Sequence, residues 1–99
     1  MEQSFFDENQ LIYNLRGKEY TELKDYSKAI EDFSETLRLK PNHDETLLIR
    51  GKAYYLAGEK GKAKADIDEY LNRKHNAAET AGRSEILKIV GVKPEDIMN

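Results

Sequence analysis

Apolar residues recur at steps of three and four along most of the chain, and this spacing predicts amphipathic helices. Two such runs, at residues 11–23 and 26–39, are separated by a short polar turn. Similar runs follow at 47–57, at 63–71 and at about 77–90. The pattern therefore predicts an all-α fold of helices joined by short connections.

Residues suited to helix ends stand between these runs. Asp25 can cap the second helix, and Pro41 stops it because proline disfavours a helical residue before it. Asn42, followed three residues later by Glu45, resembles a capping pair, which predicts that the third helix begins just after Asn42. Gly58 is expected to end the third helix in a left-handed conformation.

The chain contains an internal repeat of 34 residues. Residues 10–43 and 44–77 are identical at eleven of 34 aligned positions, where unrelated segments would share roughly two or three. A fixed period of this length indicates that one pair of helices is built twice. The first-unit members of the identical pairs are Arg16, Gly17, Lys18, Tyr20, Lys28, Ala29, Asp32, Glu35, Leu37, Lys40 and Asn42.

The repeated glycines predict a close approach of helices. Gly17 and Gly51 lie in the middle of helical runs, where glycine costs roughly 1 kcal/mol relative to alanine. Close helix packing is the usual reason for accepting that cost, and we expect Ala29 and Ala63 to be the small partners that face them. Each unit cannot bury its apolar stripe alone, so the two units are expected to stack.

The spacing of the repeated residues resembles a known family signature. In the two units the positions concerned are Tyr13, Arg16, Gly17, Tyr20, Ala29, Phe33 and Pro41, then Leu47, Arg50, Gly51, Tyr54, Ala63 and Ile67. This series is similar to the tetratricopeptide repeat (TPR), with Tyr13 and Arg16 in place of its Trp and Leu. The resemblance implies a right-handed α-solenoid of two helix-turn-helix pairs with a fifth, capping helix.

The same resemblance implies a concave groove lined by the first helix of each pair. The candidate partner-binding residues are Asn14, Lys18, Leu48, Lys52, Tyr55 and Arg83. Lys18 and Lys52 stand at equivalent repeat positions and could meet a carboxylate. An alternative stays open, in which Leu48 and Tyr55 pack against the fifth helix and both lysines are solvated.

Some members of that family bind acidic C-terminal peptides through a clamp of two Lys, two Asn and one Arg. This chain departs from the clamp, because Asn14, Lys18 and Ile49 replace its first Lys, its first Asn and its second Asn. Arg83 is the one candidate counterpart of a clamp residue. Binding of chaperone tails is therefore not predicted.

Composition excludes several classes of function. The 99 residues include no Cys, so disulfides and Cys-ligated metals are absent, and the net charge of -3 disfavours nucleic-acid binding. His43 and His75 are expected in turns about one repeat apart, too far from each other to share a metal. No motif suggests an activated nucleophile. We expect no enzyme activity, no cofactor and no metal site.

The amino-terminal residues lack the basic region and apolar stretch of a signal peptide, and the longest apolar run, 53–57, is too short to span a bilayer. We therefore expect a soluble cytoplasmic domain that does not enter a membrane. The predicted organisation is 1–9 as an N-terminal segment, 10–43 and 44–77 as the two repeats, 78–91 as the capping helix ended by Gly91, and 92–99 as a C-terminal tail.

The predicted function is a non-catalytic protein–protein interaction module that binds an unknown protein or peptide in a short groove. The alternative is a self-assembling structural unit, a homo-oligomer. Met1–Ile49 carries eleven acidic and six basic residues, whereas Arg50–Asn99 carries eight acidic and ten basic, so head-to-tail copies would bring opposite charges together. Phe5 and Phe6 are expected either to cap the first helix or to mark a self-association surface.

Overall fold

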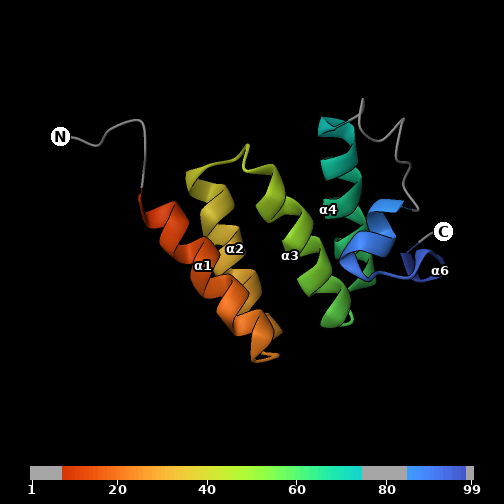
Figure 1. The fold of residues 1–99 in the computed structure, drawn as a ribbon, viewed down its shortest axis with the longest axis horizontal. Helices are drawn as coiled ribbons and strands as arrows, with labels where there is room; N and C mark the ends of the chain where they lie inside the picture. The colour runs from red at the N-terminus through yellow and green to blue at the C-terminus, as the bar shows by residue number, and fades with distance from the viewer. Residues whose placement is uncertain (1–7, 75–84, 98–99) are drawn as a thin grey trace.

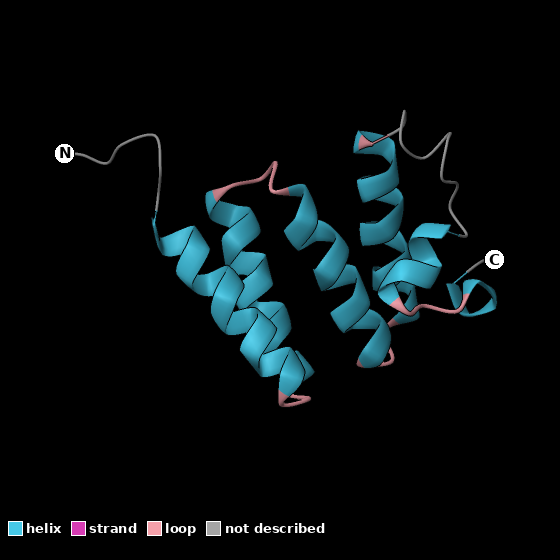
Figure 2. Ribbon diagram, in the orientation of Figure 1, coloured by secondary structure: helices cyan, strands magenta, loops and turns pink. Residues whose placement is uncertain are grey.

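A computed structural model describes residues 8–74 and 85–97, and within them every regular element is helical (Figures 1 and 2). The predicted all-α fold is confirmed. The phenylalanines of the amino-terminal segment, together with His75, Arg83 and the first part of the predicted capping helix, lie outside the described residues. The elements are α1 (Glu8–Glu22), α2 (Tyr26–Leu39), α3 (Asp44–Leu56), α4 (Lys60–Arg73), a helical stretch at 85–90, and α6 (Pro94–Ile97).

Successive helices pack against each other in chain order. Helix α1 packs against α2 and α3 against α4, and α2 contacts α3 to join the two pairs. Figure 1 shows α1 at one end of this stack and the segment 85–97 at the other. Part of the predicted C-terminal tail is helical, since α6 is a helical turn that packs against α4 and buries Ile97.

The turn inside each pair has the same backbone in both repeats. Lys24 and Gly58, which are 34 residues apart, both have a positive φ, of 65° and 87°. The next amide closes the turn in each case: Asp25 N donates to Tyr20 O at 2.9 Å, and Glu59 N donates to Tyr54 O at 2.8 Å. The left-handed conformation predicted for Gly58 is confirmed, and Lys24 adopts it without the freedom of glycine.

Replacing Lys24 by glycine is therefore expected to raise the free energy of unfolding by about 1 kcal/mol, since left-handed backbone costs an L-residue roughly that much. The matched change, Gly58→Ala, should lower it by about 1 kcal/mol, because an added Cβ meets no atom within 4 Å and only the backbone is strained. Urea unfolding of both variants measures the effect. An unchanged Lys24→Gly midpoint would contradict the strain.

The N-terminal caps of the helices agree only in part with those predicted from the sequence. Asp25 caps α2 as predicted, and its Oδ1 accepts from Lys28 N at 3.3 Å. The capping pair predicted at Asn42 and Glu45 is wrong, because α3 begins at Asp44 and is capped by His43. The His43 Nδ1 lies 2.7 Å from Thr46 Oγ1 and accepts weakly from Thr46 N at 3.4 Å.

The close approach at the repeated glycines is confirmed, but the partner at Gly17 is larger than expected. A Cβ added to Gly17 would lie 2.5 Å from Cε1 of Phe33, so the aromatic ring fills the space that a side chain would take. At Gly51 the fit is looser, with Ile67 Cγ1 at 3.1 Å and the Ala63 carbonyl at 3.4 Å. Ala29 instead packs with Phe33 and Ala53 between the two pairs.

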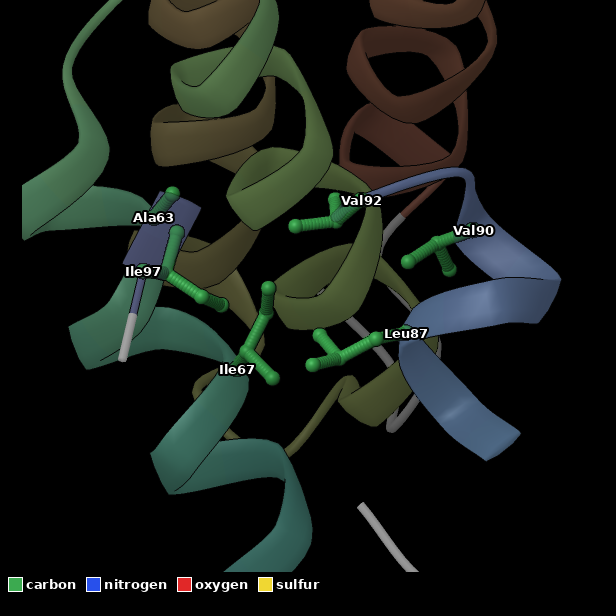
Figure 3. Close-up of a cluster of buried hydrophobic side chains, with 6 residues drawn as sticks. All are labelled: Ala63, Ile67, Leu87, Val90, Val92 and Ile97. Carbon is green, nitrogen blue, oxygen red and sulfur yellow. The ribbon is translucent and has the colours of Figure 1, made fainter. Parts of the chain in front are cut away.

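The second pair is covered by the C-terminal segment. Ala63 and Ile67 of α4 stand at the repeat positions of Ala29 and Phe33 of α2. Where the α2 residues meet α3, the α4 residues meet side chains from 85–97 (Figure 3). Those side chains are Leu87, Val90, Val92 and Ile97. The segment 85–97 therefore occupies the place beside α4 that α3 occupies beside α2.

An arginine–aspartate clasp joins the two helices of each pair. Arg16 donates from Nε to Asp32 Oδ2 at 2.7 Å and from Nη2 to Oδ1 at 2.9 Å. Arg50 and Asp66 repeat both contacts at the same two distances. Each guanidinium also lies within 6 Å of a tyrosine ring centroid. The clasp, the tyrosine beside it and the glycine next to its arginine therefore explain four of the eleven positions that are identical in the two repeats. In the first repeat these are Arg16, Gly17, Tyr20 and Asp32.

A second ionic link ties the end of α4 to the turn between the pairs. Arg73 Nη1 donates to the carbonyl of Pro41 at 2.8 Å and to Asp44 Oδ1 at 3.2 Å. The Arg73 guanidinium lowers the pKa of Asp44 below its ordinary value of 3.8. Because the folded pKa is the lower one, this stabilisation is present above pH 3.8 and is lost as the pH falls further.

Candidate functional site

A pocket of about 260 Å³ opens between the first helices of the two pairs. Helix α1 contributes one wall and α3 the other, while Phe33 of α2 lies between them. The volume lies just below the usual range for small-molecule sites, so it suits one or two side chains of a peptide. The lining residues are Lys18, Thr21, Glu22, Phe33, Ile49 and Lys52.

Two lysines at equivalent repeat positions face this pocket. Lys18 Nζ lies 3.5 Å from Glu45 Oε2, and both side chains are well exposed, so the pair is weak and easily exchanged. Lys52 makes no hydrogen bond or ion pair to another residue in the described part of the chain. The pocket therefore offers at least one ammonium group to a negatively charged ligand.

The inner surface of the pocket is apolar. Phe33 is buried in the core shared by the two pairs, and Ile49 packs against the same cluster while remaining half-buried. Thr21 donates its hydroxyl to the Gly17 carbonyl at 2.9 Å, which fixes that side chain on α1. Each wall carries one lysine, and Glu22 stands beside Lys18 on α1. An apolar floor with a lysine on each wall can hold a hydrophobic side chain that has a carboxylate beside it.

The other predicted groove residues lie beneath the next element of the stack. Asn14 is 3% exposed and donates to Thr46 Oγ1 of α3 at 2.5 Å. Leu48, at the equivalent position of the second repeat, packs against the core closed by 85–97. Each residue is covered because another helical element follows it in the stack, whereas Lys18 and Lys52 lie one turn further on and stay accessible.

Tyr55 holds the C-terminal segment against α3. Its hydroxyl donates to Asp96 Oδ2 at 2.5 Å, and the backbone N–H of Lys93 donates to the same hydroxyl at 3.4 Å. The hydrogen bond to Asp96 raises the pKa of Tyr55, and it lowers the pKa of Asp96, which is also 3.6 Å from Lys60. Of the two alternatives for Leu48 and Tyr55, the structure favours packing against the C-terminal segment.

Four lining residues were not among the predicted contacts: Thr21, Glu22, Phe33 and Ile49. Thr21 and Glu22 follow Lys18 by about one helical turn, and Ile49 precedes Lys52 by about one turn, so helical spacing could have found all three. Phe33 comes from α2, and its ring occupies the space left by the absent side chain of Gly17. The glycine is therefore the only sequence signal for the position of this ring. Arg83 lies outside the described residues.

Within 8–74 and 85–97, no group of three or more His, Asp or Glu side chains is placed to hold a metal ion. None of the helices in that part of the chain is both long and apolar enough to cross a membrane.

Comparison with known proteins gives a family and one curated relative. The chain is 29% identical over 69 residues to the photosystem I assembly protein Ycf3 of Acaryochloris marina (strain MBIC 11017). That alignment covers 70% of this chain but only 41% of the relative, so the chain spans less than half of that protein's length. No solved structure gives a significant match.

The family model for the tetratricopeptide repeat matches residues 11–43. The matched segment contains α2 and nearly all of α1, which form the first helix pair, and α3 and α4 repeat that pair 34 residues later. The first helix pair therefore matches the tetratricopeptide repeat family, and the second pair repeats the same arrangement.

Proposed function

We propose that the chain binds an extended segment of a partner protein in the pocket between α1 and α3, without catalysing a reaction. An apolar side chain of the partner would rest on Phe33 and Ile49, and an adjacent carboxylate would meet Lys52 and Lys18. The observation that carries the proposal is the pairing of two repeat-equivalent lysines with an apolar floor in one pocket.

The match of residues 11–43 to this repeat family supports the broader role of a protein–protein interaction module. The name of the matched relative, an assembly protein for photosystem I, also fits a role in bringing proteins together. Its particular partner is not transferred, because less than half of that protein is covered. A cytoplasmic location stays a prediction from the sequence.

The pocket is tested with a dye-labelled peptide of alternating Leu and Glu residues, and with matched peptides of Leu and Lys or of Ser and Glu. We expect only the first peptide to shift the amide resonances around Lys18, Ile49 and Lys52. Lys52→Glu should weaken its binding by about tenfold, equivalent to about 1.4 kcal/mol, because repulsion replaces attraction.

Lys40→Glu provides the matched control, because Lys40 is an exposed lysine outside the pocket. It changes the net charge equally and should leave the affinity within about twofold of the wild type. Equal losses in the two variants would show a nonspecific charge effect and contradict the proposal. Resonance shifts confined to other surfaces would contradict it as well.

A further inference from the structure

The outward face of α1 carries apolar side chains that no described element covers. Leu11, Ile12 and Leu15 are 44%, 56% and 52% exposed. They lie within about one helical turn, on the side of α1 opposite Gly17, which faces α2. Figure 1 shows α1 at the free end of the stack. Clustered exposed aliphatic residues of this kind mark an interaction surface more often than isolated ones do.

The internal repeat shows what covers such a face. Ile12 and Leu15 correspond to Thr46 and Ile49 of α3 after a shift of 34 residues. In α3, Thr46 is fully buried and bonded to α1, and Ile49 packs against the core of α2. A helix therefore lies on this face in the second repeat, and the first repeat presents the same face without one.

A second copy of the chain does not offer the matching helix. The α2 surface that meets α3 is built from Ala29 and Phe33, and its counterpart in α4 is built from Ala63 and Ile67. That counterpart is already covered by Leu87 and its neighbours in the C-terminal segment. Head-to-tail stacking of copies would require the C-terminal segment to detach from α4 and expose the hydrophobic core that it covers.

The charges beside the apolar residues identify the partner further. Glu8 and Glu19 are exposed and continue the same face at helical spacing with Ile12 and Leu15. They form no ion pair with another described residue, whereas the neighbouring Arg16 is engaged by Asp32. Two antiparallel α1 helices would set these glutamates against each other, and an anionic membrane surface would be repelled.

We propose that this outer face of α1 is a second docking surface, which binds a basic amphipathic helix of a partner protein. The apolar residues Ile12 and Leu15 receive the hydrophobic stripe of that helix, and the two glutamates meet lysines or arginines beside it. This surface does not include the pocket between α1 and α3, so this proposal does not depend on the proposed function.

The test uses a dye-labelled helical peptide of about 18 residues, with leucines along one stripe and lysines beside it, and a second peptide with glutamates in place of the lysines. Fluorescence anisotropy with the full chain should show binding of the lysine peptide only. Ile12→Ser with Leu15→Ser should weaken that binding by more than about tenfold. Glu8→Lys with Glu19→Lys should transfer the preference to the glutamate peptide.

Two controls separate this surface from others. Ile89→Ser removes an aliphatic side chain that is 70% exposed at the opposite end of the stack, and it should leave the affinity unchanged. Lys52→Glu should also bind the lysine peptide as tightly as the wild type. Equal weakening in either control, or equal binding of the two peptides, overturns the proposal.

The other occupants of this face give distinct results. If residues 1–7 cover it, Ile12→Ser with Leu15→Ser will lower the melting temperature of the chain alone by many degrees. If a second copy covers it, sedimentation will show concentration-dependent dimers that the same double variant abolishes. Either result overturns the proposal, whereas a monomer of unchanged melting temperature that loses only peptide binding supports it.

Discussion

Phe33→Ala is expected to lower the free energy of unfolding by about 4 kcal/mol, the largest effect of any single change proposed for this chain. The ring is 1% exposed, it fills the space beside Gly17, and it is the largest buried side chain of the cluster formed with Ala29 and Ala53. Small domains have net stabilities of about 5–15 kcal/mol, so the variant should be close to unfolding at room temperature. Urea denaturation followed by circular dichroism measures the loss.

The contact with Gly17 can be isolated by a double-mutant cycle that uses the milder Phe33→Leu. In the wild-type background Gly17→Ala should cost about 1–3 kcal/mol, because the added Cβ clashes with the ring despite the higher helix propensity of alanine. In the Phe33→Leu background the same change should cost much less, which gives a coupling energy above about 1 kcal/mol.

Gly51→Ala is the matched control for this cycle. Its Cβ would lie 3.1 Å from Ile67 Cγ1, so a small shift of the neighbour is enough and the net effect should stay within about 0.5 kcal/mol. A Gly17→Ala variant as stable as the wild type would show that the ring moves aside at no cost.

Arg50→Met is expected to lower the free energy of unfolding by about 3 kcal/mol. The Arg50 side chain is 21% exposed and that of Asp66 only 9%, so the change leaves a buried carboxylate without its bidentate partner. It also removes the hydrogen bond of 3.1 Å from Arg50 Nη1 to Ser34 Oγ, which joins α3 to the first pair. The loss should vary little with salt, because a buried pair is poorly screened.

Two further variants test this account of the clasp. Arg16→Met in the first repeat should cost less, because the Arg16 side chain is 54% exposed and water can replace it beside Asp32. Arg50→Met with Asp66→Leu should recover most of the stability, since no unpaired charge then remains. A double variant no more stable than Arg50→Met alone would show that the clasp acts through geometry and not through charge compensation.

The sequence predicts the helices, their pairing and the repeat because these follow from local spacing and from glycine positions. It does not predict the clasps, although Arg16 and Asp32 are conserved between the two repeats, because residues 16 positions apart meet only once two helices are paired. The wrong capping pair at Asn42 has a similar cause. His43 could cap α3 only through the exact path of the turn, which the order of residues does not reveal.

The candidate site is predictable at the two lysines and much less so around them. Lys18 and Lys52 repeat with the period of the fold and point to the side where the first helices of the pairs face each other. Asn14 and Leu48 share that period, yet each is covered by a later element of the chain. Helical spacing assigns a residue to a face, and only tertiary packing decides whether the face stays open.

The hydrogen bonds from Arg73 to Pro41 and Asp44 affect how cooperatively the protein unfolds. Repeat proteins in which each unit contacts only its nearest neighbour can lose one terminal unit while the others persist. Here Arg73, in the last turn of α4, is hydrogen-bonded to the turn that ends the first repeat. Unfolding of either repeat therefore also breaks the bond between Arg73 and Pro41. Melting should therefore be a single cooperative transition and not a stepwise loss of repeats.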